Sequence, residues 1–291
     1  MKVSGFTFLR NGQKLGYPFV ASIRSALPLV DEFVVALGPC DDDTEKLLRE
    51  IGDPKIRIIP TQWNENIRPD YSIKGFVYGQ QKSIALFNCT GDWAFYLEAD
   101  EVLHENDLPK IRAAMEKHLR DERVEALVFD YLHFYGNANT YAWSPAWYRS
   151  EVRIIRNTIP AWASEGLFFN VVVGHKKSRY PRAVHTGATI YHYGWVRSEE
   201  QMTAKSTAVL KYWQNRAANE VEYSQIDSAV LKSFTGTHPQ AVQSWLPRAE
   251  GIFKADANYK LSSREKKHRL MLKLENLFGA RFDKKHYQLV R

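Results

Sequence analysis

The stretch Asp92-Trp93-Ala94-Phe95-Tyr96-Leu97-Glu98-Ala99-Asp100-Glu101 decides the fold, because an apolar and aromatic run leads directly into three carboxylates. The run from Trp93 to Leu97 predicts a buried strand. Open α/β sheets bind ligands at the carboxyl ends of their strands, so the carboxylates are expected in a crevice. Carboxylates this close repel one another unless a cation lies among them, and Mg²⁺-like ions take one or two carboxylates plus phosphate oxygens. The pattern indicates a metal site; the competing interpretation is a solvated acidic turn.

Strands and helices alternate on both sides of this stretch. The sequence predicts strands over residues 2–9, 33–37, 56–59 and 93–97, and helices over 18–27, 44–51, 80–88 and 107–119. This spacing predicts a parallel sheet with right-handed crossovers. Further strands are expected over 125–134, 150–156, 168–173 and 188–192, and mostly helices after the capping box at Ser198–Gln201. The predicted class is α/β, with a first domain over 1–197 and a helical, basic C-terminal extension over 198–291.

Composition describes a globular protein, with 44% hydrophobic and 25% charged residues. No run approaches the roughly 18 apolar residues of a membrane span. The N-terminus reaches Arg10 too soon for a signal peptide, and two cysteines make no disulfide framework, so a cytoplasmic location is expected. From Lys260 onward, ten Lys/Arg accompany three Asp/Glu. This basic end indicates an anionic surface such as membrane lipid, or a solvated helical face.

Three groups of residues carry a family resemblance. Leu29 to Val35, the acidic loop ending in Asp43-Thr44, and Gly91-Asp92-Trp93 with Leu97 to Glu101 resemble family 2 glycosyltransferases. The nearest subgroup is the bacterial lipopolysaccharide core and surface polysaccharide transferases. The resemblance covers about residues 3–200. It implies a GT-A fold with a Rossmann-like nucleotide-binding sheet, a nucleotide-sugar donor (UDP-linked), Mn²⁺ or Mg²⁺, inversion at the anomeric carbon, and a saccharide or glycolipid acceptor at the inner face of the membrane.

The resemblance also assigns metal and donor residues. Asp100 matches the last carboxylate of the family's Asp-x-Asp motif and is expected on the metal, and Glu98 replaces its first Asp. His192 stands where a third metal ligand is expected, although a lone His on an apolar strand is also typical of a hydrogen-bonded core residue. The usual Asp at the end of the second strand is missing, since Leu37-Gly38 stand there. The full set of residues expected at the donor is Arg10, Asn11, Asp41, Asp42, Asp43, Lys82, Glu98 and Ala99.

An inverting transfer needs a base on the acceptor hydroxyl. Glu165 is the candidate, since partial burial near Trp162 and Phe168 would raise its pKa, and Glu151 is the reserve. A surface-turn glutamate is the competing interpretation of Glu165. Acceptor binding is expected at Tyr141, Trp143 and Trp147, in an aromatic-rich stretch that suits stacking on sugars but is equally typical of a core.

Other interpretations remain open at this point. A sugar nucleotidyltransferase requires a glycine-rich loop after the first strand, where only Gly12 stands. A non-catalytic carbohydrate-binding module would use the same aromatics. A nucleic-acid reader would place basic residues beside its aromatics, and here they lie apart, so no nucleic acid is expected. Leu270, Leu274, Leu277 and Phe278 share one side of the last helix, which is expected to pack on the body or to rest on a membrane.

Overall fold

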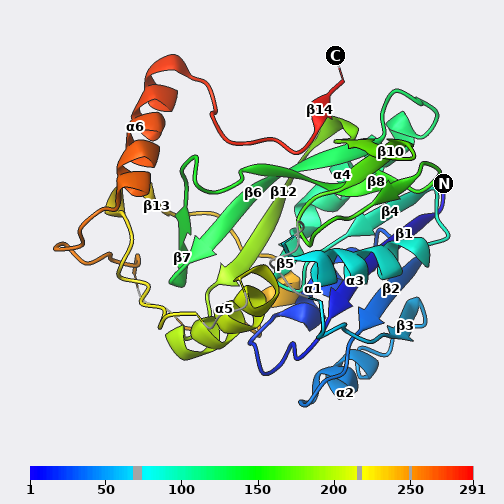
Figure 1. Cartoon of the computed structure of the whole chain (residues 1–291), viewed down its shortest axis with the longest axis horizontal. Helices are drawn as coiled ribbons and strands as arrows, with labels where there is room; N and C mark the ends of the chain where they lie inside the picture. Colours follow the sequence, from blue (N-terminus) through cyan, green and yellow to red (C-terminus); the bar gives the residue numbers. More distant parts are fainter. Residues whose placement is uncertain (68–73, 215–217, 249–250, 291) are drawn as a thin grey trace.

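The first half of the chain forms a parallel sheet with helices on both faces. The computed structural model describes residues 1–67, 74–214, 218–248 and 251–290. Pairing is parallel between β1 and β2, β2 and β3, and β1 and β4. The bounds are β1 (Val3–Leu9), α1 (Phe19–Ala26), β2 (Glu32–Leu37), α2 (Thr44–Arg49), β3 (Ile56–Pro60), α3 (Phe76–Phe87), β4 (Trp93–Tyr96) and α4 (Leu108–His118). The predicted α/β class is confirmed (Figure 1).

The second half extends this sheet with mostly antiparallel strands. The order is β13-β7-β6-β8-β4-β1-β2-β3, with β12 beside β6, and β9, β10 and β11 form a separate small sheet. The bounds are β5 (Glu101–Leu103), β6 (Ala126–Tyr135), β7 (Asn137–Ala142), β8 (Ser150–Arg156), β9 (Ala161–Trp162), β10 (Asn170–Gly174), β11 (Lys177–Arg179), β12 (Arg182–Trp195), β13 (Leu231–Ser233) and β14 (Gln288–Leu289).

Strand β4 explains the apolar run that precedes the carboxylates. Successive strand side chains point to opposite faces. Trp93 and Phe95 pack into the core on one face of the sheet, whereas Ala94 and Tyr96 pack into the core on the other, beside α3. Both faces are therefore covered by protein, which is why the strand is continuously apolar rather than alternating.

The short strand β5, which the sequence did not predict, brings His192 to the carboxylates. It pairs antiparallel with β12, and His192 lies opposite Glu101. Strand β12 continues to Trp195, so His192 lies within the strand and not at its end. Two segments far apart in sequence thus meet immediately after Asp100.

The part of the chain from residue 198 is less helical than predicted. Among the described residues its α-helices are α5 (Glu199–Gln214) and α6 (Ser263–Phe278), and two short 3₁₀ helices span Ser228–Val230 and Gln240–Val242. Strands β13 and β14 pair with β7 and β12 of the main sheet. None of the described helices combines the length and apolarity needed to cross a bilayer.

Helix α6 packs through the side opposite to its predicted apolar face. Its buried residues are Leu272 and Glu275, and both Glu275 carboxylate oxygens accept hydrogen bonds from buried Arg149. The residues of the apolar stripe are exposed: Leu270 (58%), Leu274 (37%), Leu277 (74%) and Phe278 (68%). The expectation that this stripe packs on the body is wrong, because the ion pair to Glu275 fixes the other side inward. Figure 1 shows α6 at the edge of the molecule.

Candidate active site

A crevice of about 230 Å³ opens at the carboxyl ends of β1 and β4. Glu98, Ala99 and Asp100 line it immediately after β4, and Leu9 and Arg10 line it at the end of β1. Helix α5 forms another wall through Lys205, Val209 and Trp213. The remaining lining residues are Phe8, Leu15, Tyr17, Trp63, Tyr78, Tyr96, Gly166 and Leu167. The crevice therefore combines a carboxylate end with aromatic walls.

Glu98, Asp100 and His192 form a cluster of potential metal ligands. Each offers one ligand atom, and these atoms lie within 4.8 Å of one another. Asp100 Oδ1 lies 3.5 Å from His192 Nε2. Two carboxylates and an imidazole suit Mg²⁺ or Mn²⁺ with substrate oxygens completing the coordination.

The neighbouring His133 determines the tautomer of His192: which ring nitrogen donates a hydrogen bond and which one faces Asp100 with a lone pair. His133 Nε2 lies 2.6 Å from the Tyr148 carbonyl oxygen, which only accepts, so this nitrogen carries the proton. Burial and then His192 lower the pKa of His133 well below its ordinary value, so its ring is neutral and its Nδ1 accepts a hydrogen bond from His192 Nδ1 at 2.8 Å. In a neutral His192 the lone pair at Nε2 then points to a carboxylate oxygen. His192 Nε2 and Asp100 Oδ1 are then both acceptors, and two acceptors face each other in this way when they share a cation. Histidines that bind a metal typically donate a hydrogen bond through their other ring nitrogen, as His192 Nδ1 does here.

Three basic side chains of the protein pair with the carboxylates of Glu98, Asp100 and Glu101. Asp100 Oδ2 accepts hydrogen bonds from Lys205 Nζ (2.7 Å) and Arg197 Nη2 (3.0 Å). Burial alone would raise the pKa of Asp100, but the neighbouring Lys205 charge outweighs it and holds that pKa well below its ordinary value. These bonds use Oδ2 and leave Oδ1 facing His192. The ligand set therefore fits a cation at Oδ1, although the pairing of Asp100 with two basic side chains was not predicted.

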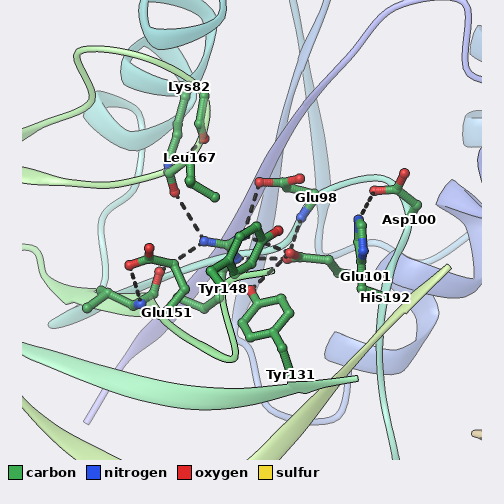
Figure 2. A network of polar contacts seen from close by, with 12 residues as sticks. Lys82, Glu98, Asp100, Glu101, Tyr131, Tyr148, Glu151, Leu167 and His192 are labelled. Carbon is green, nitrogen blue, oxygen red and sulfur yellow. Dashed lines mark hydrogen bonds and ion pairs between the residues drawn. The ribbon is translucent and has the colours of Figure 1, made fainter. Parts of the chain in front are cut away.

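Arg153 neutralises the other two carboxylates. Its guanidinium donates to Glu101 (2.7 and 2.8 Å) and to Glu98 Oε1 (3.0 Å), and its side chain is fully buried. Figure 2 shows Glu98 and Glu101 in this network, with Asp100 facing His192 beside them. Burial and then the neighbouring Glu101 charge raise the pKa of Glu98 to about 7. Glu98 thus titrates near neutrality, while Glu101 is held in the strand by Arg153 and by the Tyr131 hydroxyl at 2.9 Å.

Lys82 supports a loop rather than reaching the crevice. It is completely buried, and its ammonium donates to the carbonyls of Gly166 and Leu167, both at 3.0 Å. Arg153 Nη1 donates to the same Leu167 carbonyl at 3.1 Å. The prediction that Lys82 lies at the nucleotide is wrong in this structure, because its hydrogen bonds to the two carbonyls hold it beneath the loop that lines the crevice.

Of the two candidate bases, Glu165 lies on this loop and Glu151 lies beneath it. Glu165 is half-buried beside Gly166, but it is not itself among the residues that line the crevice. Glu151 is fully buried, and its carboxylate contacts His286 Nδ1 at 2.6 Å and the Val152 amide at 2.8 Å. Glu151 therefore has no open side toward an acceptor, and its assignment as reserve base is not supported by its position.

The acidic loop after β2 lies outside the crevice. Asp41 is exposed and pairs with Lys14 at 2.8 Å, and Asp42 accepts from the amides of Lys14 and Thr44. Asp43 precedes α2 without a side-chain cap. Asn11 contributes a loop contact, since its side chain accepts from the Asp41 amide at 3.0 Å. Of the predicted donor residues in this region, only Arg10 lines the crevice, where its guanidinium lies 5.3 Å from the Trp63 ring centroid.

The three predicted acceptor aromatics do not form one platform. Tyr141 packs against a core cluster, and Trp143 lies between Arg149 and Arg281, 5.1 and 5.2 Å from its ring. Trp147 alone of the three lines a cavity, and that cavity is separate from the crevice. The aromatic-rich stretch is therefore divided between core packing and a second pocket.

Sequence reasoning missed Arg153, Arg197 and Lys205. For Arg153 there was a signal: Glu151, Arg153 and Arg156 occur within β8, all of whose residues are buried. Charges are rarely buried without partners, so a predicted core strand with charged side chains calls for partners at its ends. For Lys205 no local pattern distinguishes it from the other lysines of the chain.

No protein-family model matches the sequence, and no curated protein matches it. Among solved structures, the chain is similar to glucosyl-3-phosphoglycerate synthase from Mycobacterium tuberculosis in complex with Mn²⁺, UDP and glucosyl-3-phosphoglycerate, with 21% identity and a TM-score of 0.32. A second structure of that enzyme, with Mn²⁺, UDP-glucose and phosphoglyceric acid, matches with 22% identity and a TM-score of 0.32. Each match covers 45% of this chain and 44% of the other, so it spans less than half of the synthase.

Proposed function

We propose that this protein is a metal-dependent, inverting glycosyltransferase that moves a sugar from a UDP-linked donor to a saccharide or glycolipid acceptor. The observation that carries the proposal is that Glu98, Asp100 and His192 each offer a ligand atom within 4.8 Å of the others, at the end of the crevice that Glu98 and Asp100 line. A Mg²⁺ or Mn²⁺ ion held there would neutralise charge on the departing diphosphate.

The rest of the crevice supports the same substrate class. Lys205 and Arg197 bring two further positive charges to Asp100, and Lys205 lines the crevice, where an anionic diphosphate is attracted. Phe8, Trp63 and Tyr78 form an aromatic wall, with ring centroids 5.3–6.1 Å apart. Their planes are inclined by 57–87° to one another, so the rings offer both faces and edges to a ligand, and aromatic linings with a few polar groups are typical of small-molecule sites.

A thermal-shift screen tests the donor proposal. UDP with Mn²⁺ at a hundredfold its dissociation constant is expected to stabilise the protein by about 2.7 kcal/mol. UDP without metal should shift the melting temperature much less, and uridine with Mn²⁺ should shift it less than UDP does, because it lacks the diphosphate. If no nucleoside diphosphate raises the melting temperature in the presence of Mn²⁺ or Mg²⁺, the proposal fails.

Glu165 remains the proposed base. Lys82 and Ser83 anchor its loop, since Ser83 Oγ exchanges hydrogen bonds with Ala163 at 3.1 and 3.2 Å. Burial raises the pKa of Glu165, which favours a base that works near neutrality. Glu165→Gln is expected to keep the UDP–Mn²⁺ melting shift and to lower turnover by about 10²–10⁴-fold. Glu116→Gln, an exposed change on α4, is the control.

The pH profile separates Glu165 from Glu98. A base must be deprotonated, so turnover should fall as the pH drops through the base's raised pKa, at a pH above that of an ordinary glutamate. That acid limb should disappear from the residual activity of Glu165→Gln. A limb that persists in this variant and moves with the Mn²⁺ concentration would instead report protonation of a metal ligand such as Glu98, and it would exclude Glu165 as the base.

We further propose that α6 meets an anionic membrane that holds the acceptor. The exposed stripe of Leu270, Leu274, Leu277 and Phe278 is accompanied by exposed Lys266, Lys267 and Lys273. Apolar side chains with flanking lysines match the chemistry of an anionic lipid surface.

Vesicle sedimentation measures this contact. The protein should bind vesicles that contain phosphatidylglycerol and should bind pure phosphatidylcholine vesicles weakly. Leu277→Gln with Phe278→Gln should lower binding, and Lys266→Glu with Lys273→Glu should lower it more steeply, at about 1 kcal/mol per lysine lost. Phe87→Gln, at an exposed Phe of α3, is the matched control. Equal binding by all variants would exclude the α6 contact.

A further inference from the structure

A second cavity of about 440 Å³ lies apart from the crevice. Its lining shares no residue with that of the crevice. It is formed by β6, β12, the loop before β8, the segment over 220–230 and the first turns of α6. The lining residues on which the argument rests are Tyr135, Trp147, Trp195, Glu220, Glu222 and His268.

Three aromatic rings form a corner in this cavity. Tyr135 and Trp195 stack at 5.6 Å with an interplanar angle of 27°. Trp147 stands nearly perpendicular to both, at 75° to Trp195 and 84° to Tyr135. Such a corner offers aromatic faces on two sides, and these faces attract cations and stack on the apolar faces of sugar rings.

The rim of the cavity is acidic. Glu220 and Glu222 are exposed, and among the described residues neither forms an ion pair. Asp227 pairs with Arg269, and Glu265 accepts hydrogen bonds from Ser262 and Tyr259. No lysine or arginine lines the cavity within the described part of the chain, and His268 is its one basic side chain there. Asp227 and Glu265 are thus already engaged, and the charges of Glu220 and Glu222 beside the aromatic corner are the ones that favour a cationic ligand over a neutral or anionic one.

Helix α5 holds this rim in place. The Val221 amide donates to Thr203 Oγ1 at 2.8 Å, and the Tyr223 amide donates to Glu199 Oε1 at 2.7 Å. Glu220 and Glu222 therefore extend from a backbone that is fixed to a helix on both sides of Val221. The negative charge is thus positioned by the fold.

The cavity and the crevice approach each other through the histidine pair. The Trp147 ring lies 5.3 Å from that of His133, and His133 lies 4.8 Å from His192, which faces Asp100. Both histidines are buried, so their rings form a wall between the second cavity and the crevice, and a saccharide in the aromatic corner is held apart from the carboxylate end of the crevice.

We infer that the second cavity binds a saccharide that carries a protonated amino group. The aromatic corner stacks on a sugar ring, and the carboxylates pair with its ammonium. This binding does not depend on the proposed glycosyltransferase function, because the cavity is separate from the crevice.

Tryptophan fluorescence titration with three trisaccharides tests the inference. The glucosamine trimer, at a pH where its amines are protonated, is expected to bind at least tenfold more tightly than its fully N-acetylated form. Trigalacturonic acid should bind most weakly. Higher salt should reduce the preference for the amine, since it screens the ion pairs. Equal affinity for the amine and acetyl forms, or no binding of the amine trimer, would overturn the inference.

Two variants locate the site. Trp147→Ala should remove binding of the glucosamine trimer, but Trp147 also packs against His133. The surface variant Glu220→Gln with Glu222→Gln leaves that packing intact and should lower affinity for the amine trimer about tenfold while hardly changing affinity for the acetylated one. Unchanged binding in this double variant would contradict the inference. Glu116→Gln is the control.

The UDP–Mn²⁺ melting shift is measured on the same samples. If the shift is present and the glucosamine trimer does not bind, this inference fails while the proposed function stands. If the trimer binds and no nucleotide shifts the melting temperature, the proposed function fails while the saccharide site stands.

Discussion

Replacing Asp100 by asparagine is expected to abolish Mn²⁺-dependent binding of UDP. Asp100 Oδ1 lies 3.5 Å from His192 Nε2, and an amide at this point is a much poorer ligand for a hard cation. The variant should therefore lose the melting shift of about 2.7 kcal/mol that UDP and Mn²⁺ confer at a hundredfold the dissociation constant.

The same substitution should also lower stability without ligand. Asp100 is buried, and removing its charge leaves Lys205 and Arg197 close together without their carboxylate. Breaking a buried ion pair by removing one partner costs about 3–5 kcal/mol. Urea denaturation measures this loss. Since the variant must be folded to be informative, the nucleotide titration is done at a temperature well below its melting point.

Asp121→Asn is the matched control, because Asp121 pairs with Arg123 at the surface. A surface pair contributes about 0–1 kcal/mol, and this variant should keep the full nucleotide shift. Wild-type affinity for UDP and Mn²⁺ in Asp100→Asn would place the metal elsewhere and remove the main support for the proposed function.

The sequence predicted the parallel half of the sheet because its signals are local. An apolar run of strand length, a turn and an amphipathic helix are each visible within a window of about ten residues. The same logic placed Glu98 and Asp100 in the crevice, since a strand end in an open sheet has a defined location.

The partners of those carboxylates were not predictable in this way. Arg197 and Lys205 lie 97 and 105 residues from Asp100, and they reach it only because β12 pairs with β5 and α5 then crosses the crevice. The pattern of residue types along the chain does not reveal that positions so far apart in sequence meet in the fold. The prediction of donor contacts at Asp41, Asp42 and Asp43 was not met for the opposite reason. A local acidic motif after a strand suggested a site there, but the loop faces solvent.

Helix α6 shows how one buried charge overrides an apolar pattern. Helical periodicity correctly grouped Leu270, Leu274 and Leu277 on one side. It did not indicate which side faces the body. The ion pair of Glu275 with Arg149, buried at both ends, decides this, because separating two buried charges costs more than exposing a leucine.

Arg153→Met is expected to lower stability as much as Asp100→Asn does. The fully buried guanidinium holds Glu101 by two hydrogen bonds and Glu98 by one, and it lies 5.3 Å from the rings of Tyr96 and Tyr131. Methionine fills part of the same volume but leaves two carboxylates facing each other. The expected cost at neutral pH is about 3–5 kcal/mol, measured by urea denaturation. Arg123→Met, at an exposed ion pair, should cost less than about 1 kcal/mol.

The pH dependence identifies the cause of this loss. Without Arg153 the pKa of Glu101 in the folded protein should rise above its unfolded value, and the pKa of Glu98, already raised to about 7, should rise further. A carboxyl whose folded pKa is raised destabilises the protein increasingly as the pH rises above its unfolded pKa, so the deficit of Arg153→Met should be larger at pH 8 than at pH 5. Adding Glu101→Gln should recover part of the deficit at pH 8, because it removes one of the two repelling charges. A deficit that is the same at both pH values, and that Glu101→Gln does not reduce, would show that Arg153 acts through packing and not by neutralising the carboxylates beside the crevice.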